Sequence, residues 1–206
     1  RDTHQGGWQR QRFVGVELYG KTLGVVGLGR IGFMTALRAR ALGMRIIAHD
    51  DFINPDAAAV TEAQAELVTF AELMRRADFV SCHVPLTKQT RGLFNYECFC
   101  LMKTSAYFLN LARGEVVDEA GLIRALQEKR LAGAALDVRE QEPPAPSALT
   151  GMDNVILTPH IAAFTREGQE RVVSALGADI HRVLNGQPAK NFANFPLPKK
   201  KAAAAT

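Results

Sequence analysis

The sequence is poor in the features that mark several protein classes. It holds 3 cysteines among 206 residues, and Cys82, Cys98 and Cys100 give neither an even disulfide framework nor a paired metal-ligand spacing. No apolar run reaches the length of a membrane span, and the polar stretch before Trp8 has no signal-peptide character. We therefore expect a cytoplasmic protein without a bound metal and without a membrane partner.

A strong charge of one sign is missing as well. The formal net charge is +4, and three consecutive lysines, Lys199 to Lys201, account for most of that excess. They lie in an alanine-rich tail without interleaved aromatic residues, so we expect no nucleic-acid partner. Residues 196–206 are expected to form a disordered basic tail.

What the sequence does contain is the alternation typical of a parallel α/β sheet. Its hydrophobic content of 47% and charged content of 22% are those of an ordinary globular protein, and its length allows one substantial core plus an appendage. Short apolar runs alternate with helical patterns, which predicts a Rossmann-type doubly wound sheet. The expected strands cover residues 23–26, 44–48, 79–84, 106–111, 134–138 and 154–157.

Helical patterns fill the gaps between these runs. Thr69 opens a short helix with a capping box, residues 96–102 form another, and Asp118 caps a helix that ends near Gly133. Two longer patterns are amphipathic. The first follows Gly29 and stops at Gly43, with an apolar stripe of Ile31, Met34, Leu37 and Ala41; the second runs from Thr165 to Asn185-Gly186, with Val173, Leu176, Ile180 and Val183 on the face that must cover a surface.

Three glycines between the first strand and the first helix have the spacing of a dinucleotide-binding turn. Gly27 allows the tight turn, Gly29 lets the backbone approach phosphate oxygens, and Gly32 allows the helix to pack closely on the strand. The N–H groups at the start of that helix would then point at a pyrophosphate. This arrangement predicts that a dinucleotide binds here.

Asp50 supports the same prediction, because it closes the second strand 18 positions after Gly32. An acidic residue at about that distance accepts hydrogen bonds from an adenosine ribose and repels a 2′-phosphate, which favours NAD over NADP. The alternative is an ordinary solvated Asp that starts a turn, together with Asp51.

Three side chains suited to chemistry follow expected strands on the edge that carries Gly29. His160 suits the transfer of a proton to a ketone oxygen, because imidazole changes charge near neutral pH. Arg113 suits the binding of a carboxylate with two hydrogen bonds. Glu142 would then orient His160 through the far ring nitrogen and keep a proton available. Taken alone, a histidine after Pro159 would more often be a structural turn residue, and Arg113-Gly114 could be a turn with a solvated charge; the shared edge favours the chemical role.

Taken together, these motifs identify a resemblance to the D-2-hydroxyacid dehydrogenase family, which includes phosphoglycerate dehydrogenases and hydroxypyruvate/glyoxylate reductases. The resemblance covers about residues 8 to 192 and is specific because five motifs occur in the same order. The matching runs are Gly27-Leu-Gly-Arg-Ile-Gly32, His83-Val-Pro-Leu-Thr87, Asn110-Leu-Ala-Arg-Gly114, Ala135-Leu-Asp-Val138 through Glu142-Pro143, and Thr158-Pro-His-Ile-Ala162.

The resemblance implies an NAD-dependent oxidoreductase that interconverts 2-oxo acids and D-2-hydroxy acids by hydride transfer. It implies that Arg113 binds and polarises the 2-oxo acid, that His160 is the acid/base, and that Glu142 pairs with it. It also implies that Asp137 contacts the nicotinamide carboxamide. The cofactor-binding residues that it implies are Gly27, Gly29, Arg30, Ile31, Gly32, Asp50, Val84, Pro85, Thr90, Leu111, Ala112, Arg113, Asp137 and His160.

The sequence departs from the family in two places. Asp51 stands where the family commonly has proline. From the resemblance we also expect that these residues lack the stretch of roughly a hundred residues that begins family members. We therefore expect residues 20–164 to form the dinucleotide-binding domain, residues 1–19 an incoming linker or helix, and residues 165–195 a returning helix of the substrate domain. Such a chain would bind NAD(H) but turn over poorly, because the missing part supplies the other wall of the cleft.

Two other functions remain open at the level of sequence. Relatives that act as transcriptional corepressors keep the fold and use NAD to drive dimerisation, and the resemblance also implies a homodimer formed through the cofactor domain. The complete set of Arg113, Glu142 and His160 favours an enzyme over a pure sensor. A short-chain dehydrogenase is less well supported, because none of Tyr19, Tyr96 and Tyr107 has a lysine four positions later.

Overall fold

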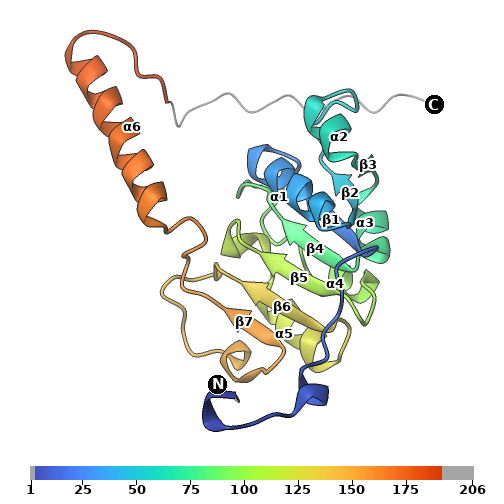
Figure 1. The fold of residues 1–206 in the computed structure, drawn as a ribbon. Coiled ribbons are helices and arrows are strands. Elements are labelled where there is room, and N and C mark those ends of the chain that lie inside the picture. Colours follow the sequence, from blue (N-terminus) through green and yellow to red (C-terminus); the bar gives the residue numbers. More distant parts are fainter. Residues whose placement is uncertain (1–2, 192–206) are drawn as a thin grey trace.

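The fold is organised around one parallel β-sheet of seven strands (Figure 1). The structure is a computed structural model that describes residues 3–191. The strand order is β3-β2-β1-β4-β5-β6-β7, and every neighbouring pair is parallel. This confirms the doubly wound α/β fold. The strands are β1 Thr22–Val26, β2 Arg45–His49, β3 Glu66–Leu67, β4 Phe79–Cys82, β5 Tyr107–Asn110, β6 Gly133–Leu136 and β7 Val155–Leu157.

Six α-helices connect or follow the strands in the described part of the chain, together with four short 3-10 segments. The α-helices are α1 Arg30–Ala41, α2 Ala58–Ala63, α3 Phe70–Arg76, α4 Tyr96–Leu101, α5 Glu119–Gln127 and α6 Arg166–Leu184. The 3-10 segments are Thr3–Gln5, Arg10–Phe13, Gly114–Val116 and Ala148–Gly151. The short α2 and β3 were not among the predicted elements, because six and two residues give too little periodicity to detect.

Side-chain caps fix where the helices begin. The Thr69 hydroxyl accepts a hydrogen bond from the Glu72 N–H (3.2 Å), and the Asp118 carboxylate accepts one from the Gly121 N–H (3.1 Å), which confirms both predicted caps. The predicted end of α5 near Gly133 was wrong. The helix ends at Gln127 because Lys129 adopts a left-handed φ of +57°, and Gly133 instead opens β6.

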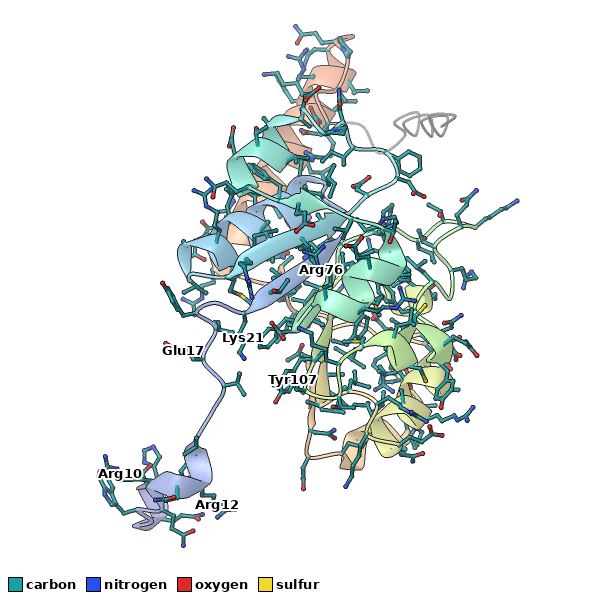
Figure 2. The ribbon with its side chains drawn as sticks, turned by 90° about the vertical axis from the view of Figure 1, so that its right-hand side faces the viewer. Arg10, Arg12, Glu17, Lys21, Arg76 and Tyr107 are labelled. Atoms are coloured by element: carbon teal, nitrogen blue, oxygen red, sulfur yellow. The ribbon has the colours of Figure 1, made fainter. Side chains whose placement is uncertain are left out.

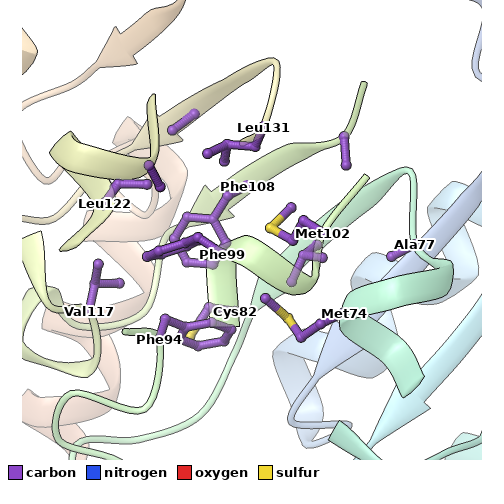
Figure 3. Packing of buried hydrophobic residues seen from close by; sticks show 14 of the residues in the cluster. Met74, Ala77, Cys82, Phe94, Phe99, Met102, Phe108, Val117, Leu122 and Leu131 are labelled. Atoms are coloured by element: carbon purple, nitrogen blue, oxygen red, sulfur yellow. The ribbon is translucent and has the colours of Figure 1, made fainter. Parts of the chain in front are cut away.

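Two hydrophobic cores lie on the two faces of the sheet. The larger core packs α3, α4 and α5 against the sheet, and its centre is the ring cluster of Phe94, Phe99 and Phe108 (Figure 3). Burying each of these side chains contributes about 1.5–3 kcal/mol. The smaller core packs α1 and α2 against β1 and β2 through small and branched side chains. The two cores hold the strand ends, and therefore the loops that follow them, in fixed positions.

The predicted apolar stripe of α1 was wrong. The side that faces the sheet consists of Gly32, Ala36 and Ala39, whereas Ile31 is 72% exposed and Met34 is 46% exposed. Helix α1 lies so close to β1 that larger side chains do not fit between them, because a Cβ on Gly32 would lie 2.0 Å from the carbonyl oxygen of Gly27. A stripe chosen by hydrophobicity therefore pointed to the wrong side of this helix.

The two ends of the described chain extend from this body. Figure 2 shows Arg10 and Arg12 on an N-terminal segment that lies apart from the sheet. Helix α6 also projects from the sheet in Figure 1, and its apolar residues Val173, Leu176 and Ile180 are all more than half exposed. The expected basic tail, residues 196–206, lies outside the described residues. Among residues 3–191, no helix combines the length and the apolarity needed to cross a bilayer.

Candidate active site

The loops that carry the expected site residues emerge from one edge of the sheet. Because all strands are parallel, their carboxyl ends lie along the same edge. Gly27 follows β1, His83 follows β4, Asp137 follows β6, and the segment from Thr158 to Ala162 follows β7. The edge therefore brings together segments that are more than a hundred residues apart in the sequence.

The glycine turn, residues 27–32, has the shape that a diphosphate requires. Gly27 has a φ of +92°, and a Cβ there would lie 2.9 Å from the carbonyl carbon of His83. A Cβ on Gly29, by contrast, would meet nothing within 4 Å, so the space in front of the helix is open. Helix α1 has no side-chain N-cap and no acidic residue in its first turn, which leaves its first N–H groups for an anion. The residues present fit a dinucleotide.

Two further residues of this turn, Arg30 and Ile31, are exposed in the first turn of α1 beside that space. Asp50 links the turn to the loop after β2. One carboxylate oxygen accepts a hydrogen bond from the Leu28 N–H (2.8 Å), and the other accepts one from the Phe52 N–H (2.9 Å). These bonds hold the carboxylate at the mouth of the glycine turn, where sequence reasoning expected the ribose.

The loop after β4 packs against the glycine turn. Val84 is half-buried beside Gly27, and Pro85 is exposed. The Thr90 hydroxyl donates to the carbonyl of Pro85 (2.6 Å) and accepts from the Thr87 N–H (2.8 Å), so its hydrogen bonds close this loop. His83 Nε2 is hydrogen-bonded to the Ser81 hydroxyl (2.9 Å), and burial lowers the pKa of His83 to about 4.

The loop after β5 presents Arg113. Asn110, which is 1% exposed, bonds this loop with both ends of its side-chain amide: the NH₂ donates to the Arg113 carbonyl (2.9 Å), and the oxygen accepts from the Ala112 N–H (3.0 Å). Leu111 is 46% exposed. The Arg113 guanidinium donates to the Ala112 carbonyl (2.6 Å) and, within residues 3–191, forms no ion pair. It therefore remains available to a carboxylate.

Glu142 and His160 are in direct contact. Glu142 Oε2 lies 2.7 Å from His160 Nδ1, although the two residues are 18 positions apart. The hydrogen bond from His160, together with one from the Arg139 N–H, lowers the pKa of Glu142. Both side chains are partly exposed, at 38% for Glu142 and 51% for His160. The pair thus places a carboxylate on one imidazole nitrogen and leaves Nε2 for another partner.

Asp137 fixes the loop that carries His160. Its backbone carbonyl accepts from the His160 N–H (2.8 Å), and its carboxylate accepts from the Thr158 hydroxyl (2.5 Å), the Ile161 N–H (2.9 Å) and the Ala162 N–H (2.8 Å). Burial opposes ionisation of this carboxyl, but the hydrogen bonds outweigh burial and the pKa of Asp137 is lowered. They hold His160 at a left-handed φ of +54°.

A hollow of about 630 Å³ lies beside the pair. Both Glu142 and His160 line it, and so do the buried Asp137 and the apolar Leu157. Its volume falls within the range of small-molecule sites, which are concave and contain a few convergent polar groups. A small acid would have both a proton donor and apolar walls here.

Several residues that shape this edge were missed at the level of sequence. Asn110 belongs to the Asn110–Gly114 motif, but no function was predicted for it. A polar residue at the buried end of a strand is nevertheless a signal for a structural hydrogen bond. Arg139 and Glu119, which form a partly buried ion pair, gave no such signal, because charged residues in loops and at helix starts are common. Their contact becomes visible only in three dimensions.

Comparison of the sequence with known families gives one matching domain. The profile described as "D-isomer specific 2-hydroxyacid dehydrogenase, NAD binding domain" matches residues 1–162. The D-3-phosphoglycerate dehydrogenase of Methanocaldococcus jannaschii is 47% identical over 199 residues, which are 96% of this chain and 38% of that protein. The enzyme of the same name from Archaeoglobus fulgidus is 44% identical over 197 residues, 95% of this chain and 37% of the relative. The chain thus spans less than two fifths of the length of these curated relatives.

Solved structures give the same result. The D-lactate dehydrogenase of Lactobacillus jensenii, solved with NAD+, superposes with a TM-score of 0.81 at 30% identity, covering 94% of this chain and 62% of that one. The holo form of the D-mandelate dehydrogenase of Rhodotorula graminis gives a TM-score of 0.85 at 32% identity, covering 97% of this chain and 61% of that one.

Proposed function

This chain belongs to the D-isomer specific 2-hydroxyacid dehydrogenase family, and from that premise we propose that it carries the NAD-binding and acid–base part of an enzyme that interconverts 2-oxo acids and D-2-hydroxy acids. NAD is the cofactor of the matched domain. The observation that carries the proposal is the hydrogen bond between Glu142 and His160 on the same sheet edge as the glycine turn.

His160 is the proposed acid/base. Its Nδ1 is occupied by Glu142, so Nε2 is the nitrogen that donates a proton to the ketone oxygen of a 2-oxo acid, or accepts one from the hydroxyl in the reverse direction. Bound NADH supplies the hydride for this reduction. Glu142 keeps the imidazole in one orientation and stabilises the positive charge that the ring carries before it gives up its proton.

Arg113 is the proposed binder of the substrate carboxylate. Its guanidinium has further N–H groups besides the one that donates to the Ala112 carbonyl, and two of them can grip a carboxylate side by side. A cation held there also polarises the adjacent carbonyl. Asn110 stabilises the loop that aims it. The substrate thus meets a cation at one end and a proton donor at the other.

The cofactor would lie along the edge from the glycine turn to His160. Its diphosphate would bind the N–H groups at the start of α1, and its ribose would bind Asp50. We further propose that Asp137 contacts the nicotinamide carboxamide, although its carboxylate already accepts three hydrogen bonds. The other proposed contacts are Gly27, Gly29, Arg30, Ile31, Gly32, Val84, Pro85, Thr90, Leu111, Ala112, Arg113 and His160.

For the organisation of the chain, we propose that residues 20–164 are the dinucleotide-binding domain. The segment before it and α6 after it would lead to a substrate domain, which is supported by the exposure of Trp8 (77%) and of Leu176 on α6 (59%). The cytoplasm is the proposed location, and a homodimer through the cofactor domain is the proposed assembly. Sedimentation of the chain with and without NADH tests the dimer.

Turnover of a panel of 2-oxo acids tests the function. The panel contains pairs of a 2-hydroxy acid and the corresponding 2-oxo acid. The first pair is chosen from D-3-phosphoglycerate and the others from D-lactate, D-mandelate and glyoxylate, because the names of the relatives contain these compounds. Because this chain is expected to turn over poorly, we expect slow consumption of NADH with at least one 2-oxo acid and its loss in His160→Ala. Binding of NADH that drives assembly, unchanged in His160→Ala and without turnover of any acid, would instead indicate a sensor.

A further inference from the structure

An ion pair just behind the acid–base pair has no role in the function proposed so far. Arg139 Nε lies 2.9 Å from Glu119 Oε2, and Arg139 Nη2 lies 2.5 Å from Glu119 Oε1. The two side chains are 9% and 19% exposed. A paired guanidinium and carboxylate removed from water to this degree hold each other in one geometry, because either charge alone would be poorly solvated there.

Glu119 bonds both ends of the segment that carries Glu142. It accepts hydrogen bonds from Arg139 and from the N–H of Glu140 at the start of the segment, and from the Ser147 hydroxyl (3.2 Å) at its end. Glu119 itself lies in the first turn of α5, where a negative charge is stabilised by the helix dipole. One carboxylate on a rigid helix therefore closes the loop of residues 139–147, whose members between Glu140 and Pro146 are exposed.

The loop in turn holds Glu142 against His160. The Arg139 N–H donates to Glu142 Oε1 (3.1 Å), while Glu142 Oε2 bonds His160 Nδ1 (2.7 Å). The same residue thus binds Glu119 with its side chain and Glu142 with its backbone. A continuous set of hydrogen bonds runs from α5 to the imidazole.

The geometry points to Glu119 and Arg139 as positioning residues that act through Glu142: their clamp sets the distance between the Glu142 carboxylate and His160. The catalytic meaning of this inference rests on the proposed function, but the contact between Glu142 and His160 does not. Without the clamp, the loop is free to move and Glu142 loses its hydrogen bonds from His160 and from the Arg139 N–H.

The variant Glu119→Gln tests this inference because two explanations predict opposite results. Removal of a nearby negative charge by itself lowers the pKa of any neighbouring carboxyl. Release of the loop instead raises the pKa of Glu142, because the hydrogen bonds that lower it are lost. We expect the pKa of Glu142 to rise in a ¹³C NMR titration of its carboxyl group, together with loss of the hydrogen-bonded Nδ1 proton signal of His160.

The matched control is a second two-pronged Arg–Glu pair within residues 3–191. Arg76 Nη1 and Nη2 lie 2.7 Å and 2.6 Å from the two oxygens of Glu66, but the two side chains are 40% and 56% exposed and belong to α3 and β3. Figure 2 labels Arg76. Like Glu119→Gln, Glu66→Gln removes one negative charge and replaces one of the two oxygens that accept from the arginine with an NH₂ group. It should leave the pKa of Glu142 and the signal of His160 unchanged.

Arg139→Lys provides a second measurement that retains the positive charge. A lysine keeps one ion pair and loses the two-pronged geometry, so the rise in the pKa of Glu142 should be smaller than in Glu119→Gln. A pKa of Glu142 that falls or stays constant in either variant would overturn the inference. Because the titration needs no substrate, this result stands whether or not a 2-oxo acid is turned over.

In the active enzyme the same variants should lower kcat, with the KM for NADH unchanged. Normal kcat alongside a displaced Glu142 would overturn the proposed catalytic role of the Glu142–His160 pair, and not the clamp. Reduced NADH affinity without a change in the pKa of Glu142 would overturn the inference that Glu119 and Arg139 position Glu142. The reduced affinity would then indicate a general loss of structure.

Discussion

The two halves of the active edge are constructed differently. In the glycine turn, residues 27–32, backbone atoms determine the shape, because Gly27 and Gly32 have no side chains and other backbone atoms approach them closely. The acid–base loops, residues 137–147 and 158–162, are held together by hydrogen bonds of charged side chains, such as the bond of Glu142 with His160. In the proposed function, the first half binds the diphosphate that all dinucleotides share. The second must hold particular atoms at particular distances.

This difference determines which substitutions disrupt each half. A glycine turn fails when an atom is added, because the close approach of two backbones leaves no room. A hydrogen-bonded loop fails when an atom is removed, because the partner group is left without its bond. The predictions below use these opposite sensitivities, starting with the largest expected effect.

The largest effect is expected at His160 in the acid–base loops. Asparagine tolerates the left-handed backbone found there (φ +54°), so His160→Asn should keep the loop while removing the proton donor. We expect turnover of the 2-oxo acid to fall by about 10²–10⁴-fold, with a far smaller change in NADH affinity. Steady-state kinetics and a fluorescence titration with NADH measure the two quantities. A variant that keeps its turnover would contradict the assignment of His160.

The next effect separates two glycines of the turn. A Cβ on Gly32 would lie 2.0 Å from the Gly27 carbonyl oxygen, whereas a Cβ on Gly29 would meet open space. Gly32→Ala should lower the free energy of unfolding by about 1–3 kcal/mol. Gly29→Ala, whose φ of −70° suits alanine, should leave that free energy unchanged but weaken NADH binding. Thermal unfolding and NADH titration of both variants provide the test; equal effects in both assays would refute the assigned division of roles.

A smaller, pH-dependent effect is expected from His83, which lies between the two halves. Burial lowers the pKa of His83 to about 4, whereas the unfolded value is 6.5. Between pH 6.5 and 4, the His83 imidazole is therefore protonated in the unfolded chain but neutral in the folded chain. The contribution of His83 to the free energy of unfolding is complete above pH 6.5 and decreases as the pH falls toward 4. The loss is at most about 3 kcal/mol.

Urea unfolding at several pH values measures this dependence. In His83→Gln the decrease between pH 6.5 and 4 should become shallower, because glutamine does not titrate. His181→Gln, on the exposed surface of α6, is the control and should follow the parent chain. Identical slopes in all three proteins would show that His83 is not the titrating group.

The smallest effect concerns the charge at the mouth of the glycine turn. Asp50→Asn keeps an acceptor for the Leu28 N–H but removes the carboxylate that repels a 2′-phosphate. We expect the preference for NADH over NADPH to fall by about tenfold, which corresponds to about 1.4 kcal/mol. Parallel titrations with NADH and NADPH give the ratio. A preference that stays the same would place the discrimination elsewhere on the edge.

The sequence was sufficient to predict those parts of the fold that depend on local patterns. The parallel sheet, the glycine turn and the caps at Thr69 and Asp118 follow from spacing and residue type, and the structure has all of them. The buried side of α1 could not be predicted in the same way. Its packing depends on how close β1 lies, so small residues and not the most apolar ones face the sheet.

The candidate site was predictable to the level of one sheet edge and one contact between side chains. Sequence reasoning placed Glu142 and His160 together, and they lie 2.7 Å apart. The Glu119–Arg139 pair and the three bonds that the Asp137 carboxylate makes to the loop after β7 were not predicted. Such contacts join residues about 20 positions apart or more through tertiary structure, and no periodicity records them.

Gly114 has a consequence for how this edge can move. A methyl group on it would lie 1.8 Å from the Arg139 carbonyl oxygen, so the turn that holds Arg113 and the loop that holds Glu142 touch backbone to backbone. The turn and the loop cannot move toward each other, so a displacement of one also displaces the other. If a bound acid displaced the Arg113 guanidinium, the displacement would therefore be transmitted to Glu142, the carboxylate that bonds His160. A change in the loop that holds Arg113 would then also change the position of His160.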